Sequence, residues 1–339
     1  MSTFASPGGA RTAGPDAADA ATRAGRRVPL GSLVYLAPVA MFVVLAATTS
    51  GVLSRTGIMS LLILAAVLGL ASVGQTWAVM IGGIDLSIPA TIGMANVALT
   101  TLYADGWSFV SILGVVLLAA VTIGAANGLV SSLFGLHPLV VTLGMGSLVT
   151  GSVLVATNGN TGGRVPGFIT DAVSPVGSTL GAPVPAALLL WVAVSAIVLL
   201  TERRTVLGRH LFAVGANETA ARLALVRPLL VRVTVYGASA VFAALSGLLL
   251  AGFSGGASMD IGNPYLFSTI TAVVVGGTSL LGGAGSYSRT VAGVLVTTMF
   301  TTLLVGLKVG ANMQQVMLGV AILVLITVYG RDRHVAQRL

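Results

Sequence analysis

Long apolar runs alternate with short polar or glycine-rich breaks along almost the whole chain. The runs Leu30 to Thr49 and Arg232 to Gly252 hold at most one charge each over about 20 residues, the length that crosses the hydrocarbon core of a bilayer. The pattern predicts an all-α, polytopic membrane protein with about ten transmembrane helices. Cutting at clusters of glycine, proline and charge gives the bounds 30–50, 58–81, 84–104, 108–133, 138–157, 183–201, 232–252, 265–281, 290–307 and 312–329.

Charged residues are scarce and lie unevenly between the breaks. They make up 8% of the chain, whereas a soluble domain carries about 25%, so an ordinary soluble enzyme is excluded. If the N-terminus is cytoplasmic, fourteen of the 17 basic residues fall on the cytoplasmic side and only Arg55, Arg164 and Lys308 fall outside. The positive-inside rule then predicts that both termini are cytoplasmic. Topology therefore accounts for the net charge of +8 without a nucleic-acid partner.

Residues 30–330 form the predicted transmembrane domain. Residues 1–29 are polar, rich in alanine and glycine, and predicted to be a disordered cytoplasmic tail, and residues 331–339 are predicted to be a second cytoplasmic tail. A basic segment before an apolar run also fits a secretory signal peptide. The apolar run is too long for that and further spans follow, so an uncleaved signal-anchor is favoured.

The segment 201–232 is predicted to present a short helix to the cytoplasm. Asn217 is expected to cap it, Glu218 lies in its first turn and pairs with Arg222 at i,i+4, and Pro228 is expected to end it. An alternative is an interfacial helix that lies on anionic lipid through its arginines.

Two glycine-rich breaks interrupt the apolar runs, GGIDLS at residues 82–87 and GGTSLLGG at residues 276–283. Both fall where a span descends to the cytoplasm, which suggests an internal duplication whose copies flank one pathway as broken helices. Asp85 or Ser87 is expected to cap the helix whose first turn contains Pro89. The alternative is that 82–87 is simply a turn between two spans, with Asp85 as its cap.

Polar residues inside the spans are candidates for contact with a solute. Such residues more often act as hydrogen-bonding groups between transmembrane helices. The tryptophans Trp77, Trp107 and Trp191 lie near predicted span ends, where an aromatic belt explains them. The polar candidates are Gln75, Asn96, Asn127, Thr142, Thr269, Thr271, Asn312, Gln314 and Gln315.

Four segments occur in an order that resembles the permease subunits of bacterial ABC importers for ribose, xylose, galactose and similar monosaccharides. They are GGIDLS at 82–87, the stretch 127–145, the stretch 208–223 and GGTSLLGGAGS at 276–286, within a resemblance that covers about residues 35–330. The resemblance implies a path formed by two permease subunits, two cytoplasmic ATPase subunits that drive it, and an extracytoplasmic sugar-binding protein. The chain departs from the family pattern at two places. Where the family usually has a small Ser-Gly pair after Arg222-Leu223, this chain has Ala224-Leu225, and where the family usually has Gly before Thr290, this chain has Arg289.

The breaks and the resemblance together give two sets of candidate site residues. The set expected to couple to the ATPase is Asn217, Glu218, Ala220, Ala221 and Arg222. The set expected along the translocation pathway is Gly82, Gly83, Asp85, Ser87, Asn127, Gly276, Gly277 and Ser279.

The sequence lacks the residue patterns that ATP binding and metal binding require. The sequence contains no GxxxxGK followed by Ser or Thr, and its one lysine, Lys308, sits in Leu-Lys-Val, so the chain is expected to bind no ATP and to be no enzyme. It has no cysteine, and His137, His210 and His334 are scattered, so neither a metal site nor another cofactor is expected.

The sequence therefore predicts a permease subunit in the bacterial cell membrane that moves a small polar solute, a monosaccharide on the resemblance. One rival is an ion-coupled secondary transporter, for which Asp85 is the obvious coupling carboxylate. Another is a membrane scaffold without transport, for which leucines could fill the Gly-Gly breaks without loss of function.

Overall fold

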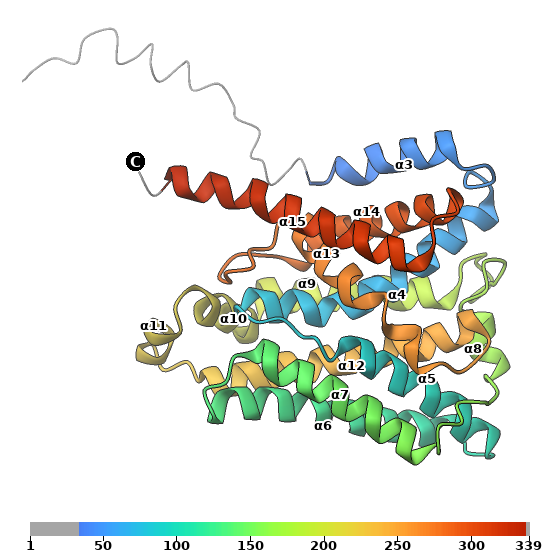
Figure 1. The fold of residues 1–339 in the computed structure, drawn as a ribbon, viewed down its shortest axis with the longest axis horizontal. Helices are drawn as coiled ribbons and strands as arrows, with labels where there is room; N and C mark the ends of the chain where they lie inside the picture. Colours follow the sequence, from blue (N-terminus) through green and yellow to red (C-terminus); the bar gives the residue numbers. More distant parts are fainter. Residues whose placement is uncertain (1–33, 337–339) are drawn as a thin grey trace, which may run out of the picture. The chain divides into compact units, whose positions relative to one another are not determined.

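The computed structural model describes residues 34–336, which are almost entirely helical (Figure 1). Within this range the one β feature is an isolated bridge between Thr179 and Ala182, so the all-α prediction is confirmed for the described chain. The predicted tail 1–29 lies outside the described residues, as do residues 337–339.

Ten helices correspond to the ten predicted spans. Six of them are long and apolar enough to cross a membrane, namely α4, α6, α7, α9, α12 and α14. The count of ten crossings stays a prediction, because α3, α5, α13 and the apolar part of α15 (Ala311–Val324) are shorter. The ten are α3 (Ala37–Thr48), α4 (Arg55–Met80), α5 (Ile88–Ala104), α6 (Phe109–Leu133), α7 (Pro138–Ala156), α9 (Ala186–Arg204), α12 (Pro228–Ser254), α13 (Tyr265–Val275), α14 (Tyr287–Gly306) and α15 (Ala311–Ala336).

Four shorter helices connect them: α8 (Gly167–Ala172), α10 (Val206–Ala216), α11 (Glu218–Leu223) and the 3-10 helix η1 (Met259–Gly262).

Helices α4 and α12 form the centre of the bundle. In Figure 1, α3, α14 and α15 lie on one side of them and α6 and α7 on the other. About two thirds of the apolar stretch of α4 is buried, against about a fifth in α6 and α7. The outer helices instead expose apolar side chains such as Val110, Leu118 and Val155. Such a surface fits a lipid environment, where exposed apolar side chains meet apolar acyl chains.

Several predicted span ends are wrong. Helix α5 begins at Ile88 rather than at residue 84, and α13 ends at Val275 rather than at residue 281, because the glycine-rich segments stay non-helical. Pro228 opens α12 instead of ending the cytoplasmic helix, since proline fits the first helical turn, where its missing N–H has no partner to lose. Helix α15 continues to Ala336, past the predicted boundary at residue 330.

Candidate functional site

Three chain segments meet at one end of the bundle. They comprise the end of α4 with Gly82, the last turn of α10 at Gly215, and the turn at Gly282 and Gly283. The Gly283 N–H donates to the Met80 carbonyl oxygen at 2.9 Å. A Cβ on Gly282, whose φ is +82°, would lie 2.9 Å from the Gly215 oxygen and 3.0 Å from the Gly82 nitrogen. We call this contact the glycine junction, because only residues without a side chain permit such close backbone approach.

The second break folds as a compact loop between α13 and α14. The Ser279 N–H donates to the Ala284 oxygen at 2.9 Å, and the Gly282 N–H donates to the Ser279 oxygen at 3.0 Å. Gly277 has a φ of +74°, and a Cβ on Gly276 would lie 2.7 Å from the Arg289 oxygen. Gly276, Gly277 and Ser279 therefore shape this loop and hold it against α14.

A buried polar chain fixes the first break. The Ser87 hydroxyl and N–H donate to Asp85 Oδ1 at 2.5 and 2.9 Å, and Asn127 Nδ2 donates to the Ser87 hydroxyl at 3.0 Å. All three side chains are buried. Thr142 of α7 holds the same stretch through its hydroxyl oxygen, which accepts the Leu86 N–H.

The expected capping role of Asp85 and Ser87 needs correction. Ser87 occupies the N-cap position of α5 and its side chain makes no cap bond there. Asp85 bonds instead to the Ser87 N–H within the preceding turn. Gly83 is buried in the same turn, where a Cβ would collide with the Tyr236 hydroxyl.

Glu202, which the sequence analysis did not single out, joins three helices. Its side chain is 6% exposed and lies near the end of α9. Its carboxylate accepts the Trp77 Nε1–H of α4 at 3.0 Å, and the Ser286 hydroxyl and Tyr287 N–H at the start of α14 at 3.1 Å each. The sequence shows only an acidic residue before two arginines at a span end, which carries no signal for an inward orientation.

Two of the three tryptophans are interior groups, so their assignment to an aromatic belt was wrong. Trp77 bonds to Glu202, and Trp191 Nε1 donates to the Tyr287 hydroxyl at 3.0 Å. The Tyr287 hydroxyl donates onward to the Gly69 oxygen at 2.9 Å. Trp107 is 46% exposed, which agrees with an interfacial position.

Helix α11 forms as the sequence predicts. Asn217 Oδ1 accepts the Ala220 N–H at 3.0 Å, and Glu218 pairs with Arg222 at 2.6 Å. Arg232 of α12 forms a second ion pair with Glu218 that the sequence analysis did not foresee.

The small residues of this helix have different environments. Ala221 is buried in a hydrophobic cluster that includes Val231 and Tyr287, whereas Ala220 is exposed. The ion pair and this packing together tie α11 to α12.

A groove of about 820 Å³ lies between the start of α5, helix α7, η1, and the start of α15. Asn312 and Gln315, two of the predicted polar candidates, line it. None of the eight residues predicted along the pathway lines the groove: Asn127 lies within α6, the other seven lie in or next to the two glycine-rich turns, and Leu86 of the first turn does reach the groove. Its polar side chains are Ser147, Thr150, Asp260, Asn263, Asn312 and Gln315.

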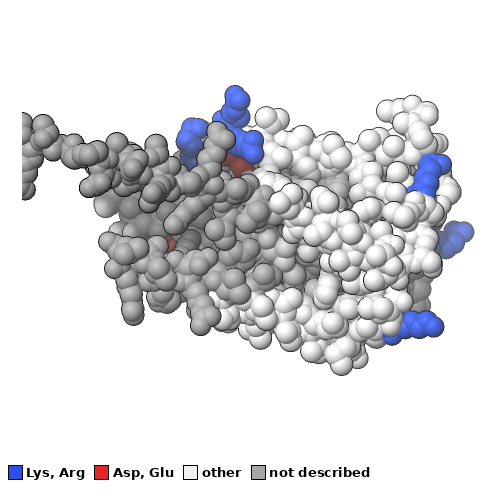
Figure 2. Space-filling view, turned by 90° about the horizontal axis from the view of Figure 1, so that it is seen from above, with Lys and Arg blue, Asp and Glu red and all other residues white. Residues whose placement is uncertain are grey.

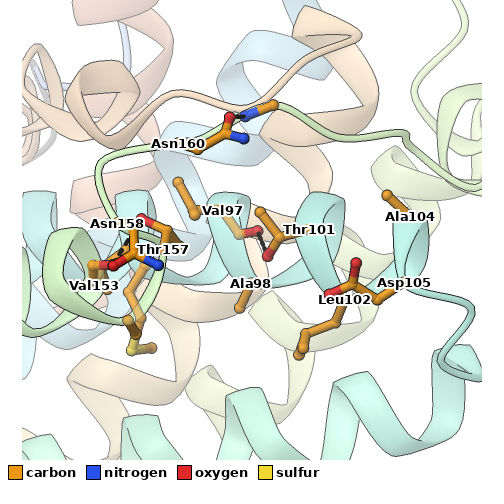
Figure 3. A pocket seen from close by; sticks show the side chains of 13 residues that line it. Val97, Ala98, Thr101, Leu102, Ala104, Asp105, Val153, Thr157, Asn158 and Asn160 are labelled. Atoms are coloured by element: carbon orange, nitrogen blue, oxygen red, sulfur yellow. Dashed lines mark hydrogen bonds between the residues drawn. The ribbon is translucent and has the colours of Figure 1, made fainter.

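A second pocket, of about 440 Å³, lies at the other ends of α5 and α7 (Figure 3). The Thr101 and Thr157 hydroxyls donate to the Val97 and Val153 oxygens of their own helices. Asn160 Oδ1 accepts the Gly162 N–H. The 820 Å³ groove contains Asn312 and Gln315, two of the residues expected to contact a solute, and the second pocket contains none of them, so the groove is the better candidate for a solute path.

The remaining polar candidates lie between helices or bond locally. Asn96 of α5 accepts the Ser258 N–H at 2.9 Å, Thr269 donates within α13, and Gln314 donates to the Val309 oxygen. Gln75 and Thr271 are buried. None of these five lines the 820 Å³ groove.

Comparison with known proteins gives a consistent result. Residues 57–326 match the family model described as "Branched-chain amino acid transport system / permease component". The probable ABC transporter permease protein YphD of Escherichia coli (strain K12) is 33% identical over 88% of both chains. The ribose import permease protein RbsC of Bacillus subtilis (strain 168) is 31% identical over 81% of this chain and 84% of its own.

A third relative is the autoinducer 2 import system permease protein LsrD of Photorhabdus laumondii. It is 30% identical over 78% of this chain and 80% of its own. No solved structure matches the chain.

Proposed function

Since the chain belongs to this family of transport-system permease components, it is a permease subunit of an ABC importer, and we propose that the solute it carries is an uncharged sugar. ATP hydrolysis is then the task of separate cytoplasmic ATPase subunits, and an extracytoplasmic binding protein delivers the solute. The family places the chain in the bacterial cell membrane as a multi-pass protein.

The composition of the groove carries this proposal. Neutral amide and hydroxyl groups dominate its polar lining, which includes one carboxylate, Asp260, and no lysine or arginine. A branched-chain amino acid would bring its own carboxylate into this groove without a cation to pair with, which is costly away from water. Sugar hydroxyls both donate and accept hydrogen bonds, as the side chains of Asn263, Asn312 and Gln315 do.

The groove is open along one side, and its polar side chains include the exposed Ser147, Asn263 and Asn312. We infer that a second permease subunit, identical or related, closes this side. In a symmetric pair the same surface of each subunit faces the other, so both would contribute polar side chains to one central path.

An uptake assay in proteoliposomes tests the function. With the ATPase subunits and ATP inside and the binding protein outside, the chain should import a labelled monosaccharide and not labelled leucine. Asn312→Ala should reduce this uptake about tenfold, because one lost polar contact costs about 1 kcal/mol or slightly more. Asn160→Ala, in the second pocket, is the matched control and should leave it unchanged.

The same assay separates the rival functions. Sugar uptake that continues after the proton gradient is dissipated, with ATP present, supports the ABC importer. Uptake that collapses under those conditions would favour an ion-coupled transporter. Equal effects of Asn312→Ala and Asn160→Ala would contradict the assignment of the groove.

We further propose that the end of the bundle with the glycine junction faces the cytoplasm and that both termini lie there. Successive predicted spans cross the membrane in opposite directions, which puts Met80 and Gly283 on one side and Arg55 and Pro183 on the other. The contacts at the two ends of the bundle agree with this assignment. Met80 meets Gly283 at one end, and Arg55 donates to the Pro183 oxygen at 3.1 Å at the other. In Figure 2 the basic side chains gather toward both ends, and the face between them is uncharged.

Single cysteines test this orientation, because the native chain has none. In intact cells, Arg204→Cys and Arg222→Cys should resist an impermeant thiol reagent, whereas Asp171→Cys should be labelled. All three positions are exposed, so burial cannot account for a difference between them. Strong labelling of Arg222→Cys from outside would reverse the orientation.

A further inference from the structure

The Asp85 carboxylate is buried with one of its two oxygens free. Its side chain is 2% exposed, and Oδ1 accepts both hydrogen bonds from Ser87. The other oxygen, Oδ2, has no hydrogen-bond partner among the described residues. A carboxylate removed from water is costly unless a positive charge or a proton neutralises it.

No basic side chain supplies that charge. Asp85 and Glu202 are the charged side chains that the described part of the chain buries, and both are acidic. The ion pairs found between residues 34 and 336 both belong to Glu218, and one of them engages Arg232, one turn before Tyr236 on α12. The compensation for Asp85 must therefore come from something other than lysine or arginine.

Three more buried side chains present free oxygen atoms around this carboxylate. They are Asn127 of α6 and Tyr236 and Ser239 of α12, and all three are fully buried. Asn127 Oδ1 and the two hydroxyls lack a hydrogen-bond partner within the described chain. The Ser239 hydroxyl lies beside the carboxylate, and the Tyr236 hydroxyl lies against Gly83, two residues before Asp85.

The hydrogen bonds of Ser87 fix which end of the Asn127 amide is free. The Ser87 hydroxyl has one proton, which it donates to Asp85 Oδ1. It can therefore only accept from Asn127, so the amide nitrogen faces Ser87 and the amide oxygen is left over. The free group is an acceptor, which cannot donate to the carboxylate but can bind a cation.

We propose that Asp85 Oδ2, Asn127 Oδ1 and the hydroxyl oxygens of Tyr236 and Ser239 bind one sodium ion. Hard cations take oxygen ligands, and one carboxylate balances one positive charge, whereas calcium sites recruit several carboxylates. A few oxygens in a closed interior suit sodium better than the larger potassium. The site has neither thiolate nor imidazole ligands, the two kinds on which the sequence-based expectation of no metal site rested.

The ion supports one wall of the solute groove. Leu86, between Asp85 and Ser87, lines the 820 Å³ groove, and its N–H donates to the Thr142 hydroxyl at 3.0 Å. The ligands come from the turn before α5, from α6 and from α12, so the ion joins these three parts behind that wall. None of the ligands lines the groove itself, so the ion is held in place and not carried with the solute.

Sodium binding to the purified chain in nanodiscs tests the site. We expect about one radioactive sodium ion bound per chain. The thermal midpoint should be several degrees higher in sodium chloride than in potassium or N-methyl-D-glucamine chloride of equal ionic strength, because a ligand of the folded state stabilises it. Asp85→Asn, which removes the charge, should lose both effects. Glu202→Gln alters the other buried carboxylate and should keep both.

A pair of serine variants on α12 tests the site without changing its charge. Ser239→Ala removes one ligand and should weaken sodium binding about tenfold or more. Ser246→Ala is the matched control, because Ser246 is also fully buried on α12 but its hydroxyl donates to the Val67 oxygen at 3.0 Å. It should keep wild-type affinity. This comparison remains decisive if Asp85→Asn does not fold.

Two results would overturn the sodium site. Equal midpoints of the wild-type chain in the three salts, with no sodium bound, would show that a proton neutralises Asp85. Sodium binding that survives in Asp85→Asn, or that falls equally in Ser239→Ala and Ser246→Ala, would place the ion elsewhere. None of these measurements uses an ATPase or a solute, so their outcome is independent of the proposed function.

Discussion

Replacement of Glu202 by alanine should lower the free energy of unfolding by about 3 kcal/mol or more. Glu202 accepts hydrogen bonds from Trp77, Ser286 and Tyr287; Trp77 and Tyr287 are buried and Ser286 is partly buried. Each buried donor that loses its acceptor costs about 1 to 3 kcal/mol. Unfolding in mixed micelles, followed by circular dichroism, measures the change.

Two further variants make this result specific. Glu202→Gln keeps an acceptor oxygen in the same place and should destabilise less than alanine. Asp171→Ala removes an exposed acidic side chain elsewhere and should stay close to wild type. If Glu202→Ala unfolded within about 0.5 kcal/mol of wild type, a typical effect for a surface substitution, the contribution of this network to stability would be refuted.

Replacement of Gly215 by alanine should abolish most ATP-driven uptake. A Cβ at this position would collide with the Met80 carbonyl oxygen and lie 2.7 Å from the Gly283 nitrogen. Because both of these contacts are with backbone atoms, no side chain can rotate to make room, and the two glycine-rich turns must separate from α10. We expect uptake to fall more than tenfold, with the altered chain still inserted in the membrane.

The control is Gly114→Ala in α6, where an added Cβ meets nothing within 4 Å. It should transport normally. Gly282→Ala, whose φ is +82° and whose Cβ would approach the Gly215 oxygen, should behave like Gly215→Ala. Normal uptake by both junction variants would refute the role of the glycine junction in transport.

Local patterns in the sequence were enough to place the helices and the cytoplasmic helix. The apolar runs determine where α4, α6 and α12 lie, because burial in lipid depends on the average character of about 20 residues. The Asn217 cap and the Glu218–Arg222 pair were predictable because both depend on neighbours within four positions.

Contacts between distant segments could not be found in this way. Arg232 reaches Glu218 from 14 residues away, and Glu202 meets Tyr287 from 85 residues away. Hydropathy also did not show that α13 ends at Val275, since the apolar residues after it continue in a non-helical loop. The groove joins four separate elements and has no signature in any one of them.

The glycine junction also sets an order for biosynthesis. It joins Met80 to Gly283, with Gly215 between them, so it cannot close until the ribosome has made about five sixths of the chain. Helices α4 to α12 can enter the membrane before that, because chains are made and fold from the N-terminus. Until residue 283 emerges, Gly215 at the end of α10 can pack against Met80 but not yet against Gly283. The junction is therefore among the last contacts of the bundle to form.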